Sequence, residues 1–206
     1  MHTVLHLVRH GSSIWNESKR LQGWKDIELS EKGISQAREL ADKLKNYPLR
    51  AVYTSTLKRA VQTGEAIARH HMLPVVQIED FKEAGFGILE GLTWEEAGKH
   101  PLLPKDLHKN RYTAKVPGGE SVEEVEKRAS KALNSIVSKH SGEHIVVVSH
   151  GLVLKSLAIY MGFTDPSHIE EFYIENASIM TVEFSHKTKS YNIIDLPVRW
   201  YPNPTS

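Results

Sequence analysis

The stretch Leu7-Val8-Arg9-His10-Gly11 ends the first apolar run of the chain, and a second apolar run, residues 145–148, ends in Ser149-His150-Gly151. Short apolar runs of this kind are typical of buried parallel strands with helices packed on both faces of the sheet. Ligands bind such sheets at the carboxyl ends of the strands. The two runs therefore predict that His10 and His150 lie together, on the floor of one anion-binding catalytic pocket.

Apolar runs and amphipathic segments alternate along most of the chain, as strands and helices do in α/β proteins. Strands are expected at residues 3–8, 51–54, 74–78 and 145–148, and a final hairpin at 179–184 and 191–194. Helices are expected after the N-caps Ser30, Ser55 or Thr56, and Ser121, and again at 152–160. The residues expected on the buried face of the helix after Ser30 are Ile34, Ala37, Leu40, Ala41 and Leu44. This order predicts a three-layer αβα sandwich with a mostly parallel central sheet and helices on both faces.

The length of 206 residues suits one domain that spans the whole chain, 1–206. Between residues 83 and 119 the alternation of strands and helices breaks off. This part holds three glycines before Trp94 and prolines at 101, 104 and 117. We expect residues 83–119 to form a small cap-like insertion over the ends of the strands.

The overall composition excludes several classes of function. A net charge of +1 gives no general attraction to nucleic acid or to an anionic membrane. The chain has no cysteine, so disulfides, thiolate catalysis and cysteine-type zinc sites are excluded. The first residues lack the features of a secretory leader, and no stretch approaches the length of a membrane span. We therefore expect a cytoplasmic protein that binds neither nucleic acid nor membrane.

The pair Arg9-His10 can carry phosphoryl chemistry. A neutral imidazole is a nucleophile at pH 7 that needs neither a metal nor a strong base. An adjacent arginine can hold a phosphoryl group with paired donors. From these residues alone, the alternative is a buried histidine with a satisfied hydrogen bond beside a surface arginine.

Three other positions extend this chemistry. Arg59 stands in the first turn of a helix that follows a strand, where backbone donors and the helix dipole favour an anion. His150-Gly151 opens another helix, so His150 can stabilise charge on transferring oxygens. Glu83, between aromatic residues and beside a glycine-rich turn, is a candidate general acid. Solvated surface positions are the alternative for Arg59 and Glu83. Together these groups suit phosphoryl transfer through a phosphohistidine, with arginines in place of magnesium and no cofactor.

The ordered motifs of the chain resemble those of the histidine phosphatase superfamily, which includes the cofactor-dependent phosphoglycerate mutases. The resemblance spans about residues 3–184 and rests on Leu7-Val8-Arg9-His10-Gly11, Trp15-Asn16, Leu21-Gln22-Gly23-Trp24, Tyr53-Thr54-Ser55, Lys58-Arg59-Ala60, Leu89-Glu90-Gly91, Pro117-Gly118-Gly119-Glu120-Ser121 and Val148-Ser149-His150-Gly151. It implies that His10 is the phosphorylated nucleophile, that Arg9, Arg59 and His150-Gly151 line the phosphate pocket, and that Glu83 is the proton donor. It also implies that Asn16, Gln22 and Gly23 contact phosphate or substrate.

Three departures from the family's mutases favour hydrolysis. Leu152 follows His150-Gly151, where mutases usually carry an asparagine; the chain is shorter in its cap; and the cap has Arg111 without a second arginine to clamp a carboxylate. Two further positions differ from relatives: Ser12 replaces a common glutamate and Leu89 a common tryptophan. We expect a phosphomonoester hydrolase that releases inorganic phosphate. A cofactor-dependent phosphoglycerate mutase remains the alternative.

The substrate class is less defined by these residues. The cap carries Lys99, Lys105, Lys109, Arg111 and Lys115 against Asp106. This excess either attracts the anionic remainder of a substrate or forms a solvated helical face. We expect broad specificity for small phosphorylated metabolites, with phosphoserine, α-ribazole phosphate or fructose bisphosphate as more specific alternatives. An exposed sheet edge also allows a homodimer.

Two competing classes of function fit these residues less well. A phospholigand-binding module on an inactive phosphatase predicts a missing nucleophile, arginine or acid, and none is missing. A metallohydrolase could use His70-His71, or His140 with His144, but no His-Glu-x-x-His pattern occurs. His6 is expected to be a hydrogen-bonded core or edge residue. We therefore expect no metal site.

Overall fold

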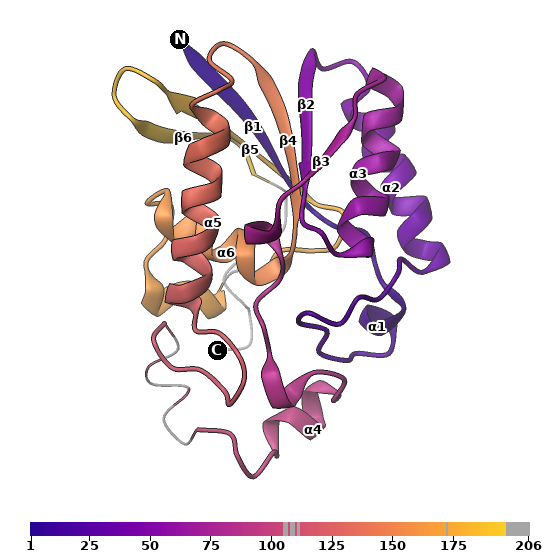
Figure 1. Ribbon diagram of the computed structural model, residues 1–206, viewed down its shortest axis with the longest axis vertical. Helices are drawn as coiled ribbons and strands as arrows, with labels where there is room; N and C mark the ends of the chain where they lie inside the picture. Colours follow the sequence, from indigo (N-terminus) through magenta and orange to yellow (C-terminus); the bar gives the residue numbers. More distant parts are fainter. Residues whose placement is uncertain (105–106, 108–109, 111, 172, 197–206) are drawn as a thin grey trace.

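The computed structural model describes residues 1–104, 107, 110, 112–171 and 173–196 of the chain. A six-stranded sheet runs through the described part in the order β3-β2-β4-β1-β5-β6 (Figure 1). Its strands are β1 (His2–Arg9), β2 (Leu49–Thr54), β3 (Val75–Gln77), β4 (His144–Ser149), β5 (Ile179–Ser185) and β6 (Ser190–Asp195). The first four strands are parallel, β5 pairs antiparallel with β1, and β6 pairs antiparallel with β5. The mostly parallel sheet and the final hairpin are confirmed.

Helices cover both faces of the sheet, which confirms the three-layer prediction (Figure 1). They are α1 (Ile14–Glu17), α2 (Glu31–Leu44), α3 (Lys58–His71), α4 (Trp94–Gly98), α5 (Val122–Val137) and α6 (Gly151–Tyr160), with the short 3₁₀ helices η1 (Glu79–Phe81), η2 (Gly87–Leu89) and η3 (Pro166–Glu171). Helices α2 and α3 lie against one face, and α5 and α6 against the other.

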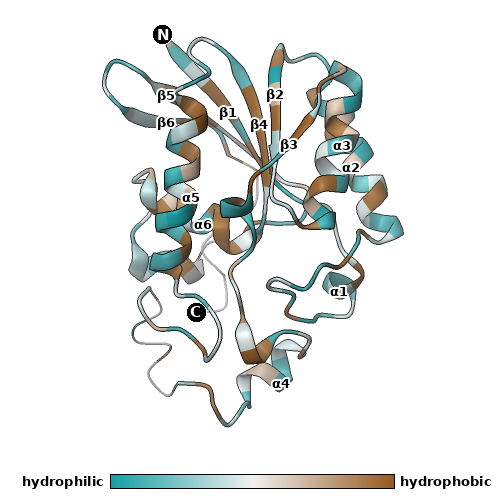
Figure 2. Ribbon diagram, viewed as in Figure 1, coloured by the Kyte–Doolittle hydropathy of each residue, from teal (hydrophilic) through white to brown (hydrophobic). Residues whose placement is uncertain are grey.

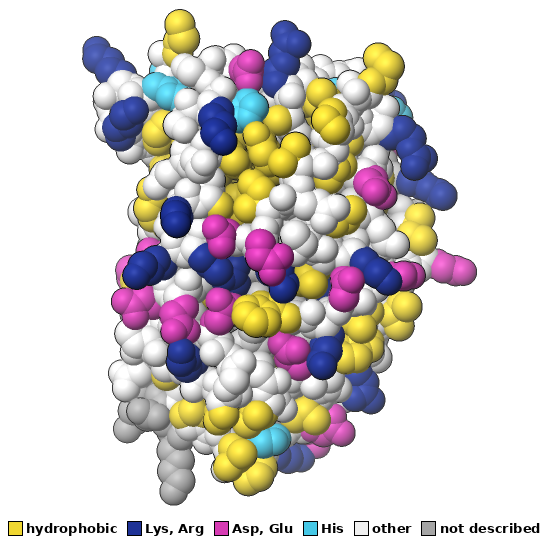
Figure 3. All heavy atoms as spheres, viewed as in Figure 1, with side chains coloured by type: hydrophobic (Ala, Val, Ile, Leu, Met, Phe, Trp, Pro, Cys, Tyr) yellow, Lys and Arg dark blue, Asp and Glu magenta, His cyan; other side chains and the backbone are white. Residues whose placement is uncertain are grey.

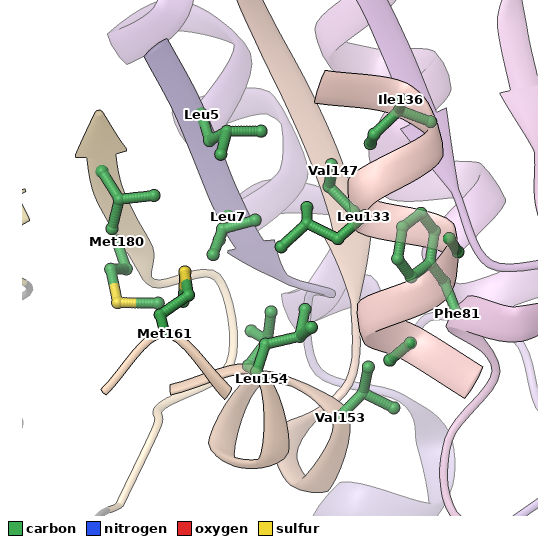
Figure 4. Packing of buried hydrophobic residues seen from close by; sticks show 14 of the residues in the cluster. Leu5, Leu7, Phe81, Leu133, Ile136, Val147, Val153, Leu154, Met161 and Met180 are labelled. Carbon is green, nitrogen blue, oxygen red and sulfur yellow. The ribbon is translucent and has the colours of Figure 1, made fainter. Parts of the chain in front are cut away.

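The larger apolar core lies between the sheet and the α5–α6 layer (Figure 4). Leu7 of β1 and Val147 of β4 face Leu133 of α5 and Leu154 of α6, and all four side chains are buried. Full burial of each such side chain contributes about 1.5–3 kcal/mol. Packing against α5 and α6 therefore fixes β1 and β4, the two strands that are followed directly by His10 and His150.

The opposite face of the same strands packs against α2 and α3. Val8, Val146 and Val148 point to this side, and each helix turns its apolar stripe inward while its outer face is hydrophilic (Figure 2). Ile34 was expected to face the core, but its side chain is 40% exposed. The first turn of α2 packs instead through Gly33 against the backbone of Ser12.

Two of the three predicted helix caps are confirmed. The hydroxyl of Ser30 accepts from the backbone of Gly33, and that of Ser121 accepts from the backbone of Glu124. The cap of α3 was predicted incorrectly. Its N-cap is Leu57, which makes no side-chain capping bond.

The described residues between 83 and 119 lie beyond the carboxyl ends of the parallel strands, at the foot of Figure 1. Leu89, Ala97 and Val116 form a small apolar cluster there with Leu21. Within the basic run, Lys99 pairs with Glu95 and Lys115 with Glu124, at 2.6 Å each. Lys105, Asp106, Lys109 and Arg111 lie outside the described residues.

Charges of both signs are mixed over the face seen in Figure 3, so no field of a single sign covers it. In the described part of the chain, no helix combines the length and the apolar character that crossing a bilayer requires.

Candidate active site

His10 lies directly after β1, and its side chain is only 2% exposed. Nδ1 lies 2.6 Å from the carbonyl oxygen of Gly11. Because a carbonyl can only accept, Nδ1 carries the proton of the neutral ring and Nε2 keeps a free lone pair. Burial lowers the pKa of His10 well below 6.5, and the nearby guanidinium groups of Arg59 and Arg9 lower this pKa further. His10 is therefore a neutral imidazole with an available nitrogen.

His150, at the N-cap of α6, lies beside His10. The two ring centroids are 5.0 Å apart and the ring planes meet at 58°. Nε2 of His150 lies 2.6 Å from Oγ of Ser55, which also accepts the backbone N–H of Leu57 at 3.3 Å. Because Nε2 is the acceptor that the described residues offer to the Ser55 hydroxyl, the hydroxyl donates its proton to Nε2, and the neutral ring carries its own proton on Nδ1. Burial, followed by the charge of Arg59, lowers the pKa of His150 well below 6.5.

Arg59 is 1% exposed, which rules out its interpretation as a solvated surface residue. Its two terminal nitrogens donate to the carbonyl oxygens of Lys25 and Gly23, at 2.9 Å each. Burial lowers its pKa to about 10, so the group remains protonated at neutral pH. Arg9 is held in a similar way, because one of its terminal nitrogens donates to the carbonyl oxygen of Ile174.

Three buried donors of this cluster have no partner: Nε of Arg9, Nε of Arg59 and Nδ1 of His150. Leaving a buried donor unsatisfied costs about 1–3 kcal/mol, and more for a charged group. Among the described residues, no carboxylate lies within ion-pair distance of Arg9 or Arg59. The site therefore gathers two guanidinium groups without ion pairs and three free donors around His10, an arrangement that suits an anion.

Glu83 is 9% exposed, so it is not the solvated loop residue that was its alternative. Its Oε1 accepts the backbone N–H of Ala84 at 2.9 Å. The negative charge of Glu83 acts on Arg59, whose pKa it raises against the larger lowering by burial. The structure therefore brings the candidate acid to the edge of the cluster around the two histidines and two arginines.

Asn16 and Gln22 belong to the loop between β1 and α2. Oδ1 of Asn16 accepts the backbone N–H of Ser13, and the single hydroxyl proton of Ser13 is shared between Oδ1 of Asn16 and Oε1 of Gln22, 3.0 and 2.7 Å away. Among the described residues these side-chain bonds engage only the two amide oxygens. Both amides thereby keep their N–H donors for another acceptor.

Gly23 and Gly151 matter through their backbones. Gly23 has a φ of +52°, and a Cβ there would lie 2.1 Å from Oε1 of Glu90. That carboxylate accepts the backbone N–H of Trp24 at 2.9 Å. Gly151 opens α6 with its backbone against the guanidinium of Arg9, because a Cβ there would lie 3.5 Å from Cζ. Gly23, through its carbonyl oxygen, and Gly151 therefore lie against the arginines of the cluster, whereas Asn16 and Gln22 are linked to each other through Ser13.

Several supporting residues were not predicted. Ser55 directs His150, and Oγ1 of Thr63 accepts the backbone N–H of Gly11 at 3.1 Å. The side-chain amide of Asn176 donates to the carbonyl oxygen of His10 at 3.1 Å. Arg128 of α5 donates to the carbonyl oxygen of Glu83 at 3.0 Å. Each acts on a backbone or ring atom far away in the sequence, so the linear pattern carried no signal for it.

The comparison with known families agrees with this geometry. A sequence model described as histidine phosphatase superfamily (branch 1) matches residues 5–195. This chain belongs to the histidine phosphatase superfamily. The histidine phosphatase fold expected from the resemblance is thereby confirmed.

Two curated relatives of this histidine phosphatase come from Arabidopsis thaliana. One, named metal-independent phosphoserine phosphatase, is 39% identical over 185 residues, which are 87% of this chain and 76% of the relative. The other, named phosphoglycerate mutase-like protein 4, is 41% identical over 155 residues, 73% of this chain and 67% of the relative. The names of the relatives of this chain thus include both a phosphatase and a mutase-like protein.

A solved phosphatase structure has the same fold. Phosphoserine phosphatase from Entamoeba histolytica, in complex with 3-phosphoglyceric acid, superposes with a TM-score of 0.83 at 29% identity, over 98% of each chain. The α/β sandwich of this histidine phosphatase is therefore that of a known phosphatase structure.

Proposed function

We propose that this histidine phosphatase hydrolyses phosphomonoesters of small metabolites through a phosphohistidine on His10. The observation that carries the proposal is the set of three buried donors without partners, on Arg9, Arg59 and His150, around a neutral His10. A tetrahedral phosphoryl group offers oxygens to all three donors. The charge of the arginines stabilises these oxygens where other phosphotransferases use magnesium.

In the first step, Nε2 of His10 attacks the phosphorus atom with its lone pair. The bond between phosphorus and the ester oxygen breaks, and its electron pair goes to the leaving oxygen. Glu83, in its protonated form, gives its proton to that oxygen and the alcohol departs. The bond from Nδ1 of His10 to the Gly11 carbonyl keeps the attacking nitrogen unprotonated.

In the second step, water attacks the phosphohistidine. The Glu83 carboxylate takes one proton from the water, the bond between nitrogen and phosphorus breaks, and the electron pair returns to Nε2. Inorganic phosphate leaves, and both His10 and Glu83 are restored. Donors on Arg9, Arg59 and His150 hold the same three oxygens in both steps. Only the phosphorus atom therefore shifts, from the ester oxygen to Nε2 and then to water.

Hydrolysis is preferred to mutase activity because Leu152 follows Gly151, where mutases of the superfamily usually carry an asparagine. The activity proposed is a metal-independent phosphomonoesterase of broad specificity. Phosphoserine and 3-phosphoglycerate come first among substrates to test, because they occur in the names of similar proteins. Phosphoglycerate mutase activity is the alternative.

The test is phosphate release from a panel of phosphomonoesters in a metal chelator, with 3-phosphoglycerate and its bisphosphate cofactor included. Release from several esters, lost in His10→Ala and kept in the surface control His70→Ala, is the expected result. Acid-labile, base-stable phosphate should be trapped on wild-type protein alone. Interconversion of phosphoglycerates without release identifies a mutase, and activity of more than a few per cent in His10→Ala rejects the nucleophile.

Three further expectations belong to this proposal. The protein is cytoplasmic, residues 83–119 act as a cap over the pocket, and the exposed edge of the sheet allows a homodimer. Light scattering of the purified protein gives the oligomeric state, and fractionation of the source cells gives the location.

A further inference from the structure

One arginine outside the cluster makes an unusual number of contacts with the backbone. Arg128 projects from α5, and one terminal nitrogen donates to the carbonyl oxygens of Asp80 and Lys82, at 2.7 Å each. The other terminal nitrogen donates to the carbonyl oxygen of Glu83 at 3.0 Å. The guanidinium therefore gathers three carbonyl groups from the segment that ends in the proposed acid.

Glu120 completes this arrangement from the other side. Its two carboxylate oxygens accept from Nε and a terminal nitrogen of Arg128, at 2.9 Å each. Oε2 also accepts the backbone N–H of Gly85 at 2.9 Å, and the backbone N–H of Glu120 donates to the carbonyl oxygen of Gly85 at 2.8 Å. Arg128 and Glu120 together hold the chain on both sides of Glu83.

The ion pair itself is largely shielded from water, with side-chain exposures of 18% for Arg128 and 17% for Glu120. A two-pronged arginine–carboxylate pair has a fixed planar geometry, which a lysine cannot reproduce. A third tie comes from Trp24, whose indole N–H donates to the carbonyl oxygen of Glu83 at 2.8 Å. The backbone of Glu83 is thus fixed from three directions.

We propose that Arg128, locked by Glu120, is a positioning residue that places the Glu83 carboxyl beside the leaving oxygen of the substrate. This inference rests on the proposed function, because it requires Glu83 to be the acid. Arg128 touches no reacting atom in this arrangement. Its effect passes through the backbone of residues 80–85. The planar arrangement of its N–H donors, rather than its charge alone, holds this segment.

The experiment compares two substrates with different demands for a proton. An alkyl phosphate needs protonation of its leaving oxygen, whereas p-nitrophenyl phosphate does not. Arg128→Lys keeps the positive charge and loses the planar set of guanidinium donors. It should lower kcat/KM for ethyl phosphate about 10–100-fold, because a displacement of about 1 Å can cost that much. The same variant should lower kcat/KM for p-nitrophenyl phosphate less than about threefold, with KM little changed.

Two controls make the result specific. Arg20→Lys removes a comparable arginine–carbonyl contact, 2.7 Å from the carbonyl oxygen of Gly91, in an exposed position. This variant should leave kcat/KM unchanged for both substrates. Arg128→Lys added to Glu83→Gln should give no further loss on ethyl phosphate, since residues acting through one group are not additive. If Arg128→Lys does not fold, Glu120→Gln and Trp24→Phe carry the same comparison.

The outcomes separate the two proposals. Glu83→Gln itself should lower kcat/KM about 10²–10⁴-fold for ethyl phosphate and little for p-nitrophenyl phosphate, because kcat/KM covers only the steps up to departure of the alcohol. If Glu83→Gln lowers kcat/KM equally for both substrates, Glu83 is not the acid, and the positioning role of Arg128 is overturned as well. The positioning role alone is overturned if Glu83→Gln is selective but Arg128→Lys lowers kcat/KM equally for both substrates. It is also overturned if Arg128→Lys lowers kcat/KM further in the double variant.

Discussion

Oγ of Ser55 lies 2.6 Å from Nε2 of His150 and accepts the backbone N–H of Leu57. One hydroxyl thus fixes the tautomer of a buried histidine and begins the turn into α3. The strand end that carries Ser55 and the strand end that carries His150 are joined directly beneath the proposed phosphate pocket.

Replacing Ser55 should weaken the binding of phosphate. In Ser55→Ala, Nε2 of His150 is buried without a donor, so the ring no longer holds its proton on Nδ1 alone. The inhibition constant of inorganic phosphate should rise about tenfold, because a lost buried hydrogen bond costs about 1–3 kcal/mol. The nitrogen chemical shifts of His150 should report mixed tautomers. Ser156→Ala is the control: Ser156 is also buried, but its hydroxyl donates to the carbonyl oxygen of Val153 within α6. Equal inhibition constants in both variants contradict this role.

Arg59 should be needed for the chemical step and not only for binding. Arg59→Lys retains a charge but cannot hold the carbonyl oxygens of Gly23 and Lys25 while offering Nε to phosphate. Its kcat should fall about 10²–10³-fold, as for the loss of a donor to developing charge. Steady-state kinetics with Arg69→Lys, an exposed arginine on the same helix, provide the comparison. A change confined to KM restricts Arg59 to binding the ground state.

Acid should destabilise the protein partly through His6, which is 1% exposed. Burial, followed by the charge of His144, lowers the pKa of His6 from 6.5 to about 4. The folded state thus binds a proton more weakly than the unfolded state, so stability is full above pH 6.5 and is lost as the pH falls towards 4. The difference corresponds to about 3 kcal/mol.

The measurement for His6 is the free energy of unfolding between pH 7.5 and 4.5, in wild type and His6→Gln. His10 and His150 also have lowered pKa values and contribute to the wild-type decline. Their contribution is common to both proteins, so the shallower slope of His6→Gln isolates His6. Parallel curves would show that His6 contributes nothing to the acid sensitivity.

Gly33→Ala should harm both stability and activity. A Cβ at Gly33 would lie 1.9 Å from the carbonyl oxygen of Ser12, two residues after His10. Relieving this overlap should cost about 1–3 kcal/mol and lower kcat. Gly98→Ala is the matched control, because nothing lies within 4 Å of a Cβ at that helical position. Thermal unfolding should show Gly98→Ala equal to wild type or more stable, since alanine favours helix. Equal melting temperatures in the two variants contradict the close packing.

The strands and the position of the site could be predicted because both depend on local patterns. Alternate residues of β4 face opposite layers, and the His-Gly pairs follow the apolar runs directly. The cap of α3 could not be predicted from the same evidence. Ser55 has the right residue type, but its Oγ accepts the N–H of Leu57, which precedes the helix, so the N-cap position falls to Leu57.

The burial of Arg59 and the role of Arg128 depend on contacts that no local pattern reveals. An arginine is normally a solvated residue, and Arg59 is buried because two loop carbonyls approach it from the segment before α2. Arg128 stands on the polar side of an amphipathic helix, where a charge is expected. Its partners belong to a segment about 45 residues earlier in the chain.

The floor of the pocket is closed by chain from both ends of the sequence. Arg9 donates to the carbonyl oxygen of Ile174, and Asn176 donates to that of His10, 166 residues before it. During translation, His10, Arg59, Glu83 and His150 all leave the ribosome before the segment that secures the first of them. A chain released after Tyr173 should therefore hold every proposed reactive group and yet hydrolyse nothing, because activity requires the later segment in which β5 pairs beside β1.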